Sequence, residues 1–472
     1  MAIRYIIQSV PSSLQVLPDI ISKTFPTEHW STNAPVVYTR NILRLLDYVP
    51  QIQSDVLTLI TSQLVKIDVH VQIDVEDLDD EMSESIVQEI SKRDDDDFES
   101  GSESEVDDDD LDSEALRLKT VKTNIIRMDM IIDILFEYYA PVFSSQTTSA
   151  KDSALDLLLS QFHNIILPSS RSRHTQFLLF HFAQTSTLLI DRFASTCINI
   201  ILNKNQPQLF RQSAAAYLGS FIARGNRVPS HVVRDVFELL AQQLNALRIE
   251  HDPTCRGPDL RRYSVFYSVA QAMIYMFCFR WRDLASSNPD DNASDDEDDP
   301  SDGEEDREIT FSHTIKDPLR AAIYSKLNPL KICSPPIVTE FAKIANRLRF
   351  LYVYPLLETN KRLRLASVRS LTDMADRSSS RGGFSLPSDV TGGQNAWGGE
   401  ESKWQLDAFF PFDPYHLPRS QRWVEGDYRE WKGLDDDKEE EEEEDEESGD
   451  DSEAEKDVVG ISALAAPKSI SV

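Results

Sequence analysis

The sequence predicts an all-α protein, a HEAT-like α-solenoid with long disordered acidic insertions and an acidic C-terminal tail. Outside the acidic runs, apolar residues recur at helical spacing and almost nowhere alternate as in strands. Helical segments of about 15 to 20 residues follow one another through short turns, and an antiparallel pair about every 40 residues is the spacing of HEAT and armadillo repeats. A large irregular helical domain without repeats is the alternative.

The acidic residues are concentrated in three runs. The chain has 472 residues and a net charge of −32, but residues 74–112 carry −18, residues 290–306 carry −11 and residues 435–457 carry −15. The rest of the chain is therefore mildly basic, at +12. Dense blocks of like charge repel themselves and bury no apolar surface, so we expect these runs to be solvated and disordered.

The first helices flank the first acidic run. Apolar spacing predicts helices over Val56 to Asp68 before the run and over Leu116 to Tyr139 after it. The residues directly after Met1 are mostly apolar, whereas the end of a solenoid needs a cap with a polar outer face. We therefore expect that N-terminal repeats are missing from this sequence, or that a partner covers that end.

The central segment gives the clearest helix boundaries. Helices are predicted over Gln176 to Ala183 and over Leu188 to Leu202. Pro207 is expected as the first residue of the next helix, Gly225 as its end, and Pro229 with Ser230 as the start of another. Long insertions at the turns of such a stack add little loop-closure entropy, which suits the placement of the acidic runs.

Tyr263 to Phe279 is an uncharged stretch of 17 residues, and we identify no other candidate for a membrane span. It lies at the lower limit of the length that crosses a bilayer. A helix buried in a large α-protein is the favoured interpretation, and no contact with a membrane is expected.

The predicted organisation combines these elements with two C-terminal features, a Ser/Gly-rich linker and an aromatic segment. The expected divisions are N-terminal helical repeats (1–73), an acidic insertion (74–112), central helical repeats (113–285), a second acidic insertion (286–308), C-terminal helical repeats (309–377), the linker (378–400), an aromatic docking segment (401–433) and an acidic tail (434–472).

The sequence contains no catalytic or metal-binding motif that we could identify. It lacks a P-loop, GxGxxG after a strand, HExxH and GxSxG, and its nine histidines are scattered. The four cysteines lie far apart without a CxxC pair, which argues against a thiolate zinc site and suits a reducing compartment. We therefore expect no enzymatic activity, no cofactor and no metal.

Two polar motifs suggest regulation and targeting. Serines within or beside the acidic runs have Asp or Glu three residues later, which suits an acidophilic kinase of the casein-kinase-II type. These candidate phosphoacceptors are Ser102, Ser104, Ser287, Ser294, Ser301, Ser448 and Ser452. The cluster Lys361, Arg362 and Arg364 suits either a nuclear import signal or a solvated helix end.

Residues 409–420, FFPFDPYHLPRS, are too aromatic to be left in water. Phe409, Phe410, Phe412 and Tyr415 are the candidate docking residues. Docking onto the same chain is favoured over docking onto a partner.

Several blocks, taken in order, resemble the family of RNA polymerase I-specific transcription initiation factors. The blocks are NILRLLDYVP, LVKIDVHVQID, HTQFLLFHFAQTS, NQPQLFRQSAAAYLGSFIARGNRVPS, YSVFYSVAQAMIYMFCFR, LNPLKICSPPIVTEFAKIANRLRFLYVYPLLETNKR and FFPFDPYHLPRS. None is a catalytic motif, but their order and their extent, from about Ile3 to Ser420, make the resemblance specific.

The resemblance implies a HEAT-repeat protein without enzymatic activity that binds RNA polymerase I on its stalk side and bridges it to the promoter-bound core factor. It also implies control by growth-linked kinases and a nuclear, nucleolar location; direct contact with DNA would be secondary, and the polymerase contacts are not assigned to residues. An acidic histone chaperone and a nuclear transport adaptor, each built on a helical solenoid, are the competing functions.

Overall fold

A computed structural model gives the fold of the chain. The structure describes residues 9–10, 12–26, 33–76, 113–169, 172–286, 309–363, 405–408, 410–413, 415 and 417–431. The longer helices in this part of the chain are α2 (Ser13–Lys23), α3 (Ala34–Leu46), α4 (Gln53–Glu76), α7 (Ser113–Ser144), α8 (Thr148–Gln161), α10 (Thr187–Leu202), α11 (Gln208–Arg224), α12 (Ser230–His251), α13 (Ser264–Leu284), α14 (His313–Ile323) and α16 (Pro335–Arg347). Shorter helices are α9 (Phe177–Ala183), α15 (Pro329–Ile332) and α19 (Gln421–Val424). Residues 354–363 are also helical.

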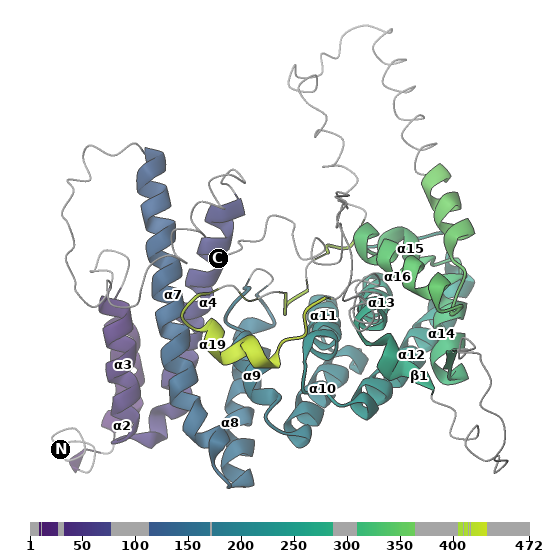
Figure 1. The fold of residues 1–472 in the computed structure, drawn as a ribbon. Helices are drawn as coiled ribbons and strands as arrows, with labels where there is room; N and C mark the ends of the chain where they lie inside the picture. Colours follow the sequence, from purple (N-terminus) through teal and green to yellow (C-terminus); the bar gives the residue numbers. More distant parts are fainter. Residues whose placement is uncertain are drawn as a thin grey trace, which may run out of the picture.

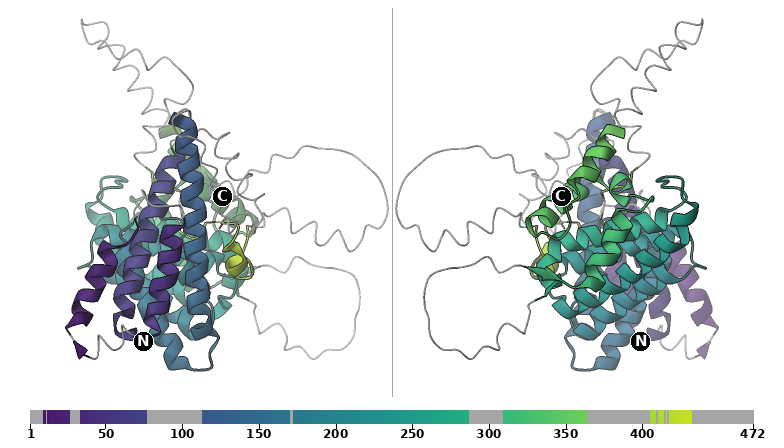
Figure 2. Two further views of the ribbon diagram at one scale, coloured as in Figure 1. Left: turned by 90° about the vertical axis from the view of Figure 1, so that its left-hand side faces the viewer. Right: turned by 90° about the vertical axis from the view of Figure 1, so that its right-hand side faces the viewer.

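The helices form a row that follows the order of the sequence. Figure 1 shows α2, α3 and α4 at one end, α7 to α11 in the middle, and α13 to α16 at the other end. The side views in Figure 2 show the neighbouring helices packed roughly side by side. The prediction of an all-α, HEAT-like solenoid is thereby confirmed.

The closest helix packing lies at the centre of the row, between α11 and α13. A Cβ at Gly219 would lie 2.8 Å from the Cβ of Ala272, so only glycine allows the two backbones to come this close. Nearly every side of α13 is buried, from Val265 to Cys278, because α11, α12 and α16 all pack on it. This burial explains why its sequence is apolar without a polar face.

The expectation that Tyr263 to Phe279 is the sole candidate for a membrane span was wrong. In the described residues, the stretch that is long and apolar enough to cross a membrane is Pro50–Val75, of which half is buried in the stack. This stretch includes the buried carboxylate of Asp68, which bonds to residues of another segment. Composition and length alone do not separate such a core helix from a membrane span.

The predicted helix ends in the central segment agree with the structure to within a residue or two. Gly225 follows the last residue of α11, and α12 begins at Ser230. Pro207 precedes α11 as its N-cap, with φ −53° and ψ 143°, and is not its first helical residue. The side chain of Ser186 caps α10 by accepting a hydrogen bond from the Leu189 N–H.

Regular secondary structure reaches the edges of the first two acidic runs. Helix α4 continues to Glu76, past the first residue of the first acidic run. Strand β1 (Ala285–Ser286) pairs antiparallel with β2 (Thr310–Phe311), with Ala285 opposite Phe311. The backbone segments on either side of the second acidic run are therefore joined by a short ladder.

Candidate functional site: a C-terminal strap across the helical stack

The described residues between 405 and 431, called the strap from here on, cross the middle of the row of helices. Figure 1 shows its helix α19 lying over α7 and α9. The strap begins near α15 and α13, where the Leu406 N–H donates to the Ile332 carbonyl at 2.8 Å and the Gln271 amide donates to the Asp407 carbonyl at 2.8 Å. It therefore connects helices that are far apart in the sequence.

Aromatic side chains hold the middle of the strap in the core. The ring of Phe410 stacks on Tyr275 of α13 with the centroids 3.8 Å apart. The fully buried Phe412 lies among rings from α9, α10 and α11, with centroid distances of 4.9 to 6.5 Å. Those rings belong to Phe177, Phe180, Phe193, Tyr217 and Phe221. The packing accounts for the dense aromatic composition of this segment.

Two buried carboxylates on α7, one helical turn apart, anchor α19 and the strap residues just before it. Asp129 accepts hydrogen bonds from the backbone N–H groups of Arg419 and Ser420, both at 2.9 Å. Asp133 accepts from the Arg419 guanidinium at 2.9 Å and from the Trp423 indole at 2.8 Å. Burial raises the pKa of Asp129, and the hydrogen bonds from Ser420 and Arg419 offset this only in part.

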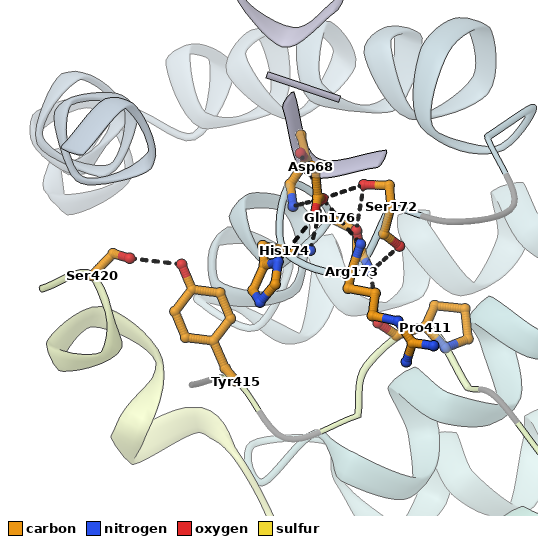
Figure 3. A network of polar contacts seen from close by, with 9 residues as sticks. Asp68, Ser172, Arg173, His174, Gln176, Pro411, Tyr415 and Ser420 are labelled. Atoms are coloured by element: carbon orange, nitrogen blue, oxygen red, sulfur yellow. Dashed lines mark hydrogen bonds and ion pairs between the residues drawn. The ribbon is translucent and has the colours of Figure 1, made fainter. Parts of the chain in front are cut away.

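A second polar network fixes the loop on which the strap rests (Figure 3). Asp68 of α4 accepts bonds from the backbone N–H groups of Arg173, His174 and Thr175 at 2.9 to 3.2 Å, and its other oxygen lies 2.9 Å from His174 Nδ1. Gln176 then donates to the Pro411 carbonyl of the strap at 2.8 Å. Burial alone would raise the pKa of Asp68, but the His174 imidazole and these hydrogen bonds lower it below its ordinary value.

The end of the strap pairs with α9 and with the turn after α11. The Asp427 carboxylate lies 2.5 Å from His181 Nδ1 and 2.7 Å from the Arg227 guanidinium. The Arg429 N–H donates to the Arg224 carbonyl at 2.7 Å. The strap thus supplies partners to the C-terminal end of α11, where carbonyl groups lack partners within the helix.

Asp413 is a buried acid within the strap. Burial raises its pKa to about 7, although the nearby positive charges of Arg224 and Arg173 act in the opposite direction. An acid whose pKa is higher in the folded state than in the unfolded state costs stability as it ionises.

Replacing Asp413 by asparagine should therefore stabilise the protein at pH 8, by at most about 2–4 kcal/mol. The wild-type protein loses stability as the pH rises from about 4 to about 7, and the variant should lack this part of the decline. Denaturant unfolding of both proteins between pH 4 and pH 8 measures it. A variant that is less stable at pH 8 than the wild type would contradict the assignment.

The residues singled out in the sequence are placed unequally. Phe410, Phe412 and Tyr415 are buried in the stack, whereas Phe409 lies outside the described residues. The seven candidate phosphoserines also lie outside them: Ser102, Ser104, Ser287, Ser294, Ser301, Ser448 and Ser452. Sequence reasoning missed Asp129 and Asp133, although two acids four residues apart within an apolar helix are a usable signal.

No group of three or more His, Cys, Asp or Glu residues suited to hold a metal ion occurs among the described residues. The four cysteines are free and buried, and burial raises the pKa of the thiols of Cys197, Cys278 and Cys333.

Residues 1–436 match the family described as RNA polymerase I specific transcription initiation factor RRN3. The chain belongs to the RRN3 family. The match includes the whole strap and ends just inside the acidic tail, so the strap is part of the RRN3 sequence pattern. Membership makes the chain a nuclear transcription factor rather than an enzyme.

Individual RRN3 proteins are similar over most of this chain. The RNA polymerase I-specific transcription initiation factor of Schizosaccharomyces pombe is 30% identical over 454 residues, covering 92% of this chain and 67% of the relative. The factor of Mus musculus is 26% identical, covering 91% and 60%. The factor of Saccharomyces cerevisiae is 23% identical, covering 91% and 70%. The chain thus spans roughly two thirds of the length of these relatives.

The fold is that of a solved RRN3 structure. The crystal structure of RNA polymerase I transcription initiation factor Rrn3 matches 91% of this chain and 72% of that chain, with a TM-score of 0.64 and 22% sequence identity. The arrangement of the helices is therefore shared, although fewer than one residue in four is identical.

Proposed function

We propose that this protein binds RNA polymerase I on its stalk side and bridges it to the promoter-bound core factor during initiation on ribosomal RNA genes, in the nucleolus. Membership of the RRN3 family is the observation that carries the proposal. The solenoid suits a bridge because stacked helices present a long surface that can contact two partners at once. The strap supports this function, because it joins α7, α9, α11 and α13 and so limits bending between them.

The edge formed by α8 and α10 is our candidate for the polymerase contact. An open groove of about 560 Å³ lies between these helices, lined by Asp156, Leu159, Ser160, Asp191, Arg192, Ser195, Thr196 and Asn199. Arg192 is paired with both Asp152 and Asp156, so its positive charge is already compensated. The exposed hydroxyl groups of Ser160 and Ser195 add hydrogen-bonding groups to the groove.

This chemistry suits control by growth-linked kinases. A phosphate would add about −1.5 to −2 charges to a groove that has uncompensated acid at Asp191. Added negative charge changes both the rate of encounter and the specificity of a charged partner. We propose that negative charge here weakens the polymerase contact.

The double variant Ser160→Asp, Ser195→Asp should bind RNA polymerase I about tenfold more weakly, equivalent to about 1.4 kcal/mol. Ser160→Ala, Ser195→Ala should bind like the wild type, because it adds no charge. Gln208→Asp, Gln242→Asp is the matched control, since it adds two acids at exposed positions on other helices. Equal weakening by both acidic doubles would show an effect of total charge and would remove α8–α10 as the contact.

The bridge itself is tested with promoter DNA and purified core factor on beads. Purified RNA polymerase I should be retained when the full chain is present and washed away when it is absent. Retention that does not depend on the chain would overturn the bridging function. The acidic histone chaperone predicts binding of histones instead, and loss of that binding when residues 74–112 and 435–457 are deleted.

A further inference from the structure

The described C-terminal end of the helical row carries exposed tyrosines. Tyr352 is 64% exposed, Tyr324 is 52% exposed, and Tyr354 is also on the surface. The Tyr324 hydroxyl donates to the Tyr352 carbonyl at 2.8 Å, and the rings of Tyr352 and Tyr354 lie 5.9 Å apart. The three side chains therefore form one surface rather than isolated exposures, and large aromatic side chains are rarely left in water together without a partner.

Positive charge surrounds these tyrosines. Residues 309–363 contain nine Lys and Arg against three Asp and Glu, a net charge of +6 in a chain of net charge −32. Lys326 follows Tyr324 by two residues, Arg349 precedes Tyr352 by three, and all of these are exposed. The two parts of the surface are linked, because Asn328 donates to Asn360 at 2.7 Å, next to Lys361 and Arg362.

Acids offset this charge only slightly. Glu340 is paired with Lys343 at 2.8 Å, which leaves Asp317 and Glu358 as the other acids of residues 309–363. Asp252, from the end of α12, accepts a bond from the Lys326 backbone N–H. The surface consequently attracts negatively charged partners, and tyrosine and arginine are the residue types most enriched at the energetic centres of protein interfaces.

We propose that this surface, called the basic tyrosine face and made of Tyr324, Lys326, Arg349, Tyr352, Tyr354, Lys361 and Arg362, binds an acidic polypeptide segment of a partner protein. The acids of the partner pair with the lysines and arginines, and its apolar side chains pack on the tyrosines and on the exposed Leu363. The basic tyrosine face is made by the turns that follow α14 and α16 and by the helix 354–363, apart from the α8–α10 edge proposed for the polymerase.

The geometry favours a polypeptide over single-stranded nucleic acid. In the binding of single-stranded nucleic acid, successive bases stack on exposed aromatic faces. The planes of Tyr352 and Tyr354 are inclined by 60°, an edge-to-face pair, and the hydroxyl of Tyr324 is already engaged by the Tyr352 carbonyl.

The test is fluorescence anisotropy of the full chain with three probes. The first is a labelled peptide of about 20 Glu and Asp residues with a leucine at every fifth position, the second replaces its acids by Gln and Asn, and the third is oligothymidine of similar length. We expect the acidic peptide to bind and the neutral one not to bind. Lys361→Glu, Arg362→Glu should weaken that binding about tenfold, and Tyr352→Ala should weaken it measurably without any change of charge.

Arg40→Glu, Lys66→Glu is the matched control, because it reverses two charges that are exposed on α3 and α4 at the far end of the row. It should leave the binding unchanged, and circular dichroism should show that every variant is folded, since all the substituted residues are exposed. Equal weakening by Arg40→Glu, Lys66→Glu would reduce the effect to net charge and overturn the proposal. Tighter binding of oligothymidine would assign the face to nucleic acid. Binding that appears only after removal of residues 432–472 would mean that the chain's own tail occupies the face. This result would overturn the proposal that the face binds a partner protein.

Discussion

Replacing Phe412 by alanine should destabilise the protein by about 3–5 kcal/mol, the usual cost of removing a buried aromatic side chain. The fully buried ring lies among five other rings, and its backbone N–H donates to Ser220 Oγ at 3.0 Å. Alanine would leave a cavity between α9 and α11 that neither helix can close, because both are held by other contacts. The effect reaches beyond the strap, since the same rings form the core of the central helices.

Thermal unfolding measures this effect, and we expect the melting temperature to fall by about 5–15 °C. Tyr48→Ala is the matched control, because it removes a half-exposed aromatic side chain just after α3. Limited proteolysis of the Phe412 variant should also show faster cleavage near the strap than in the wild type. A melting temperature within about 2 °C of the wild type would show that the strap does not stabilise the stack.

Replacing Asp68 by alanine should cost about 3–5 kcal/mol, because its removal leaves several buried donors without an acceptor. The carboxylate joins α4 to residues more than 100 positions later, through the hydroxyl of Ser172, three backbone N–H groups and the His174 ring. The loop that it holds carries Gln176, which in turn binds the strap. We therefore expect partial release of the strap together with the loss of stability.

Asp68→Asn separates charge from hydrogen bonding, since it retains one acceptor oxygen. The pKa of Asp68 is below its ordinary value in the folded protein, so the carboxylate contributes stability above about pH 4 and loses it as the pH falls further. Urea unfolding between pH 3 and pH 7 should show a weaker acid dependence in the asparagine variant than in the wild type. If Asp68→Ala unfolds at the same urea concentration as the wild type, the Asp68 network does not stabilise the fold.

Local sequence signals predicted the helices well. Pro229 and Ser230 mark the start of α12 through local backbone preferences, which do not depend on distant residues. Gly225 follows α11 in extended backbone, with φ −68° and ψ 112°, and glycine is required there because a Cβ would lie 2.7 Å from Val228 Cγ2. The aromatic composition of residues 409–420 likewise indicated a segment that docks, because the cost of exposing so many rings follows from composition alone.

The partners of that segment could not be predicted in the same way. Arg419 and Asp129 are 290 positions apart, and helical periodicity carries no information about such a pair. The sequence gives only an indirect signal of these contacts. Asp129 and Asp133 lie in an apolar helical segment, where burying an unpaired carboxylate would be costly. They require donors from elsewhere, but only the fold identifies the strap as the source.

The most direct test of the central claim is retention of purified RNA polymerases I and II by the immobilised full chain. An RNA polymerase I initiation factor should retain polymerase I in a defined complex and leave polymerase II in the wash at the same salt concentration. Retention of neither enzyme, or of both equally, would contradict the claim that this chain acts as a polymerase I-specific factor.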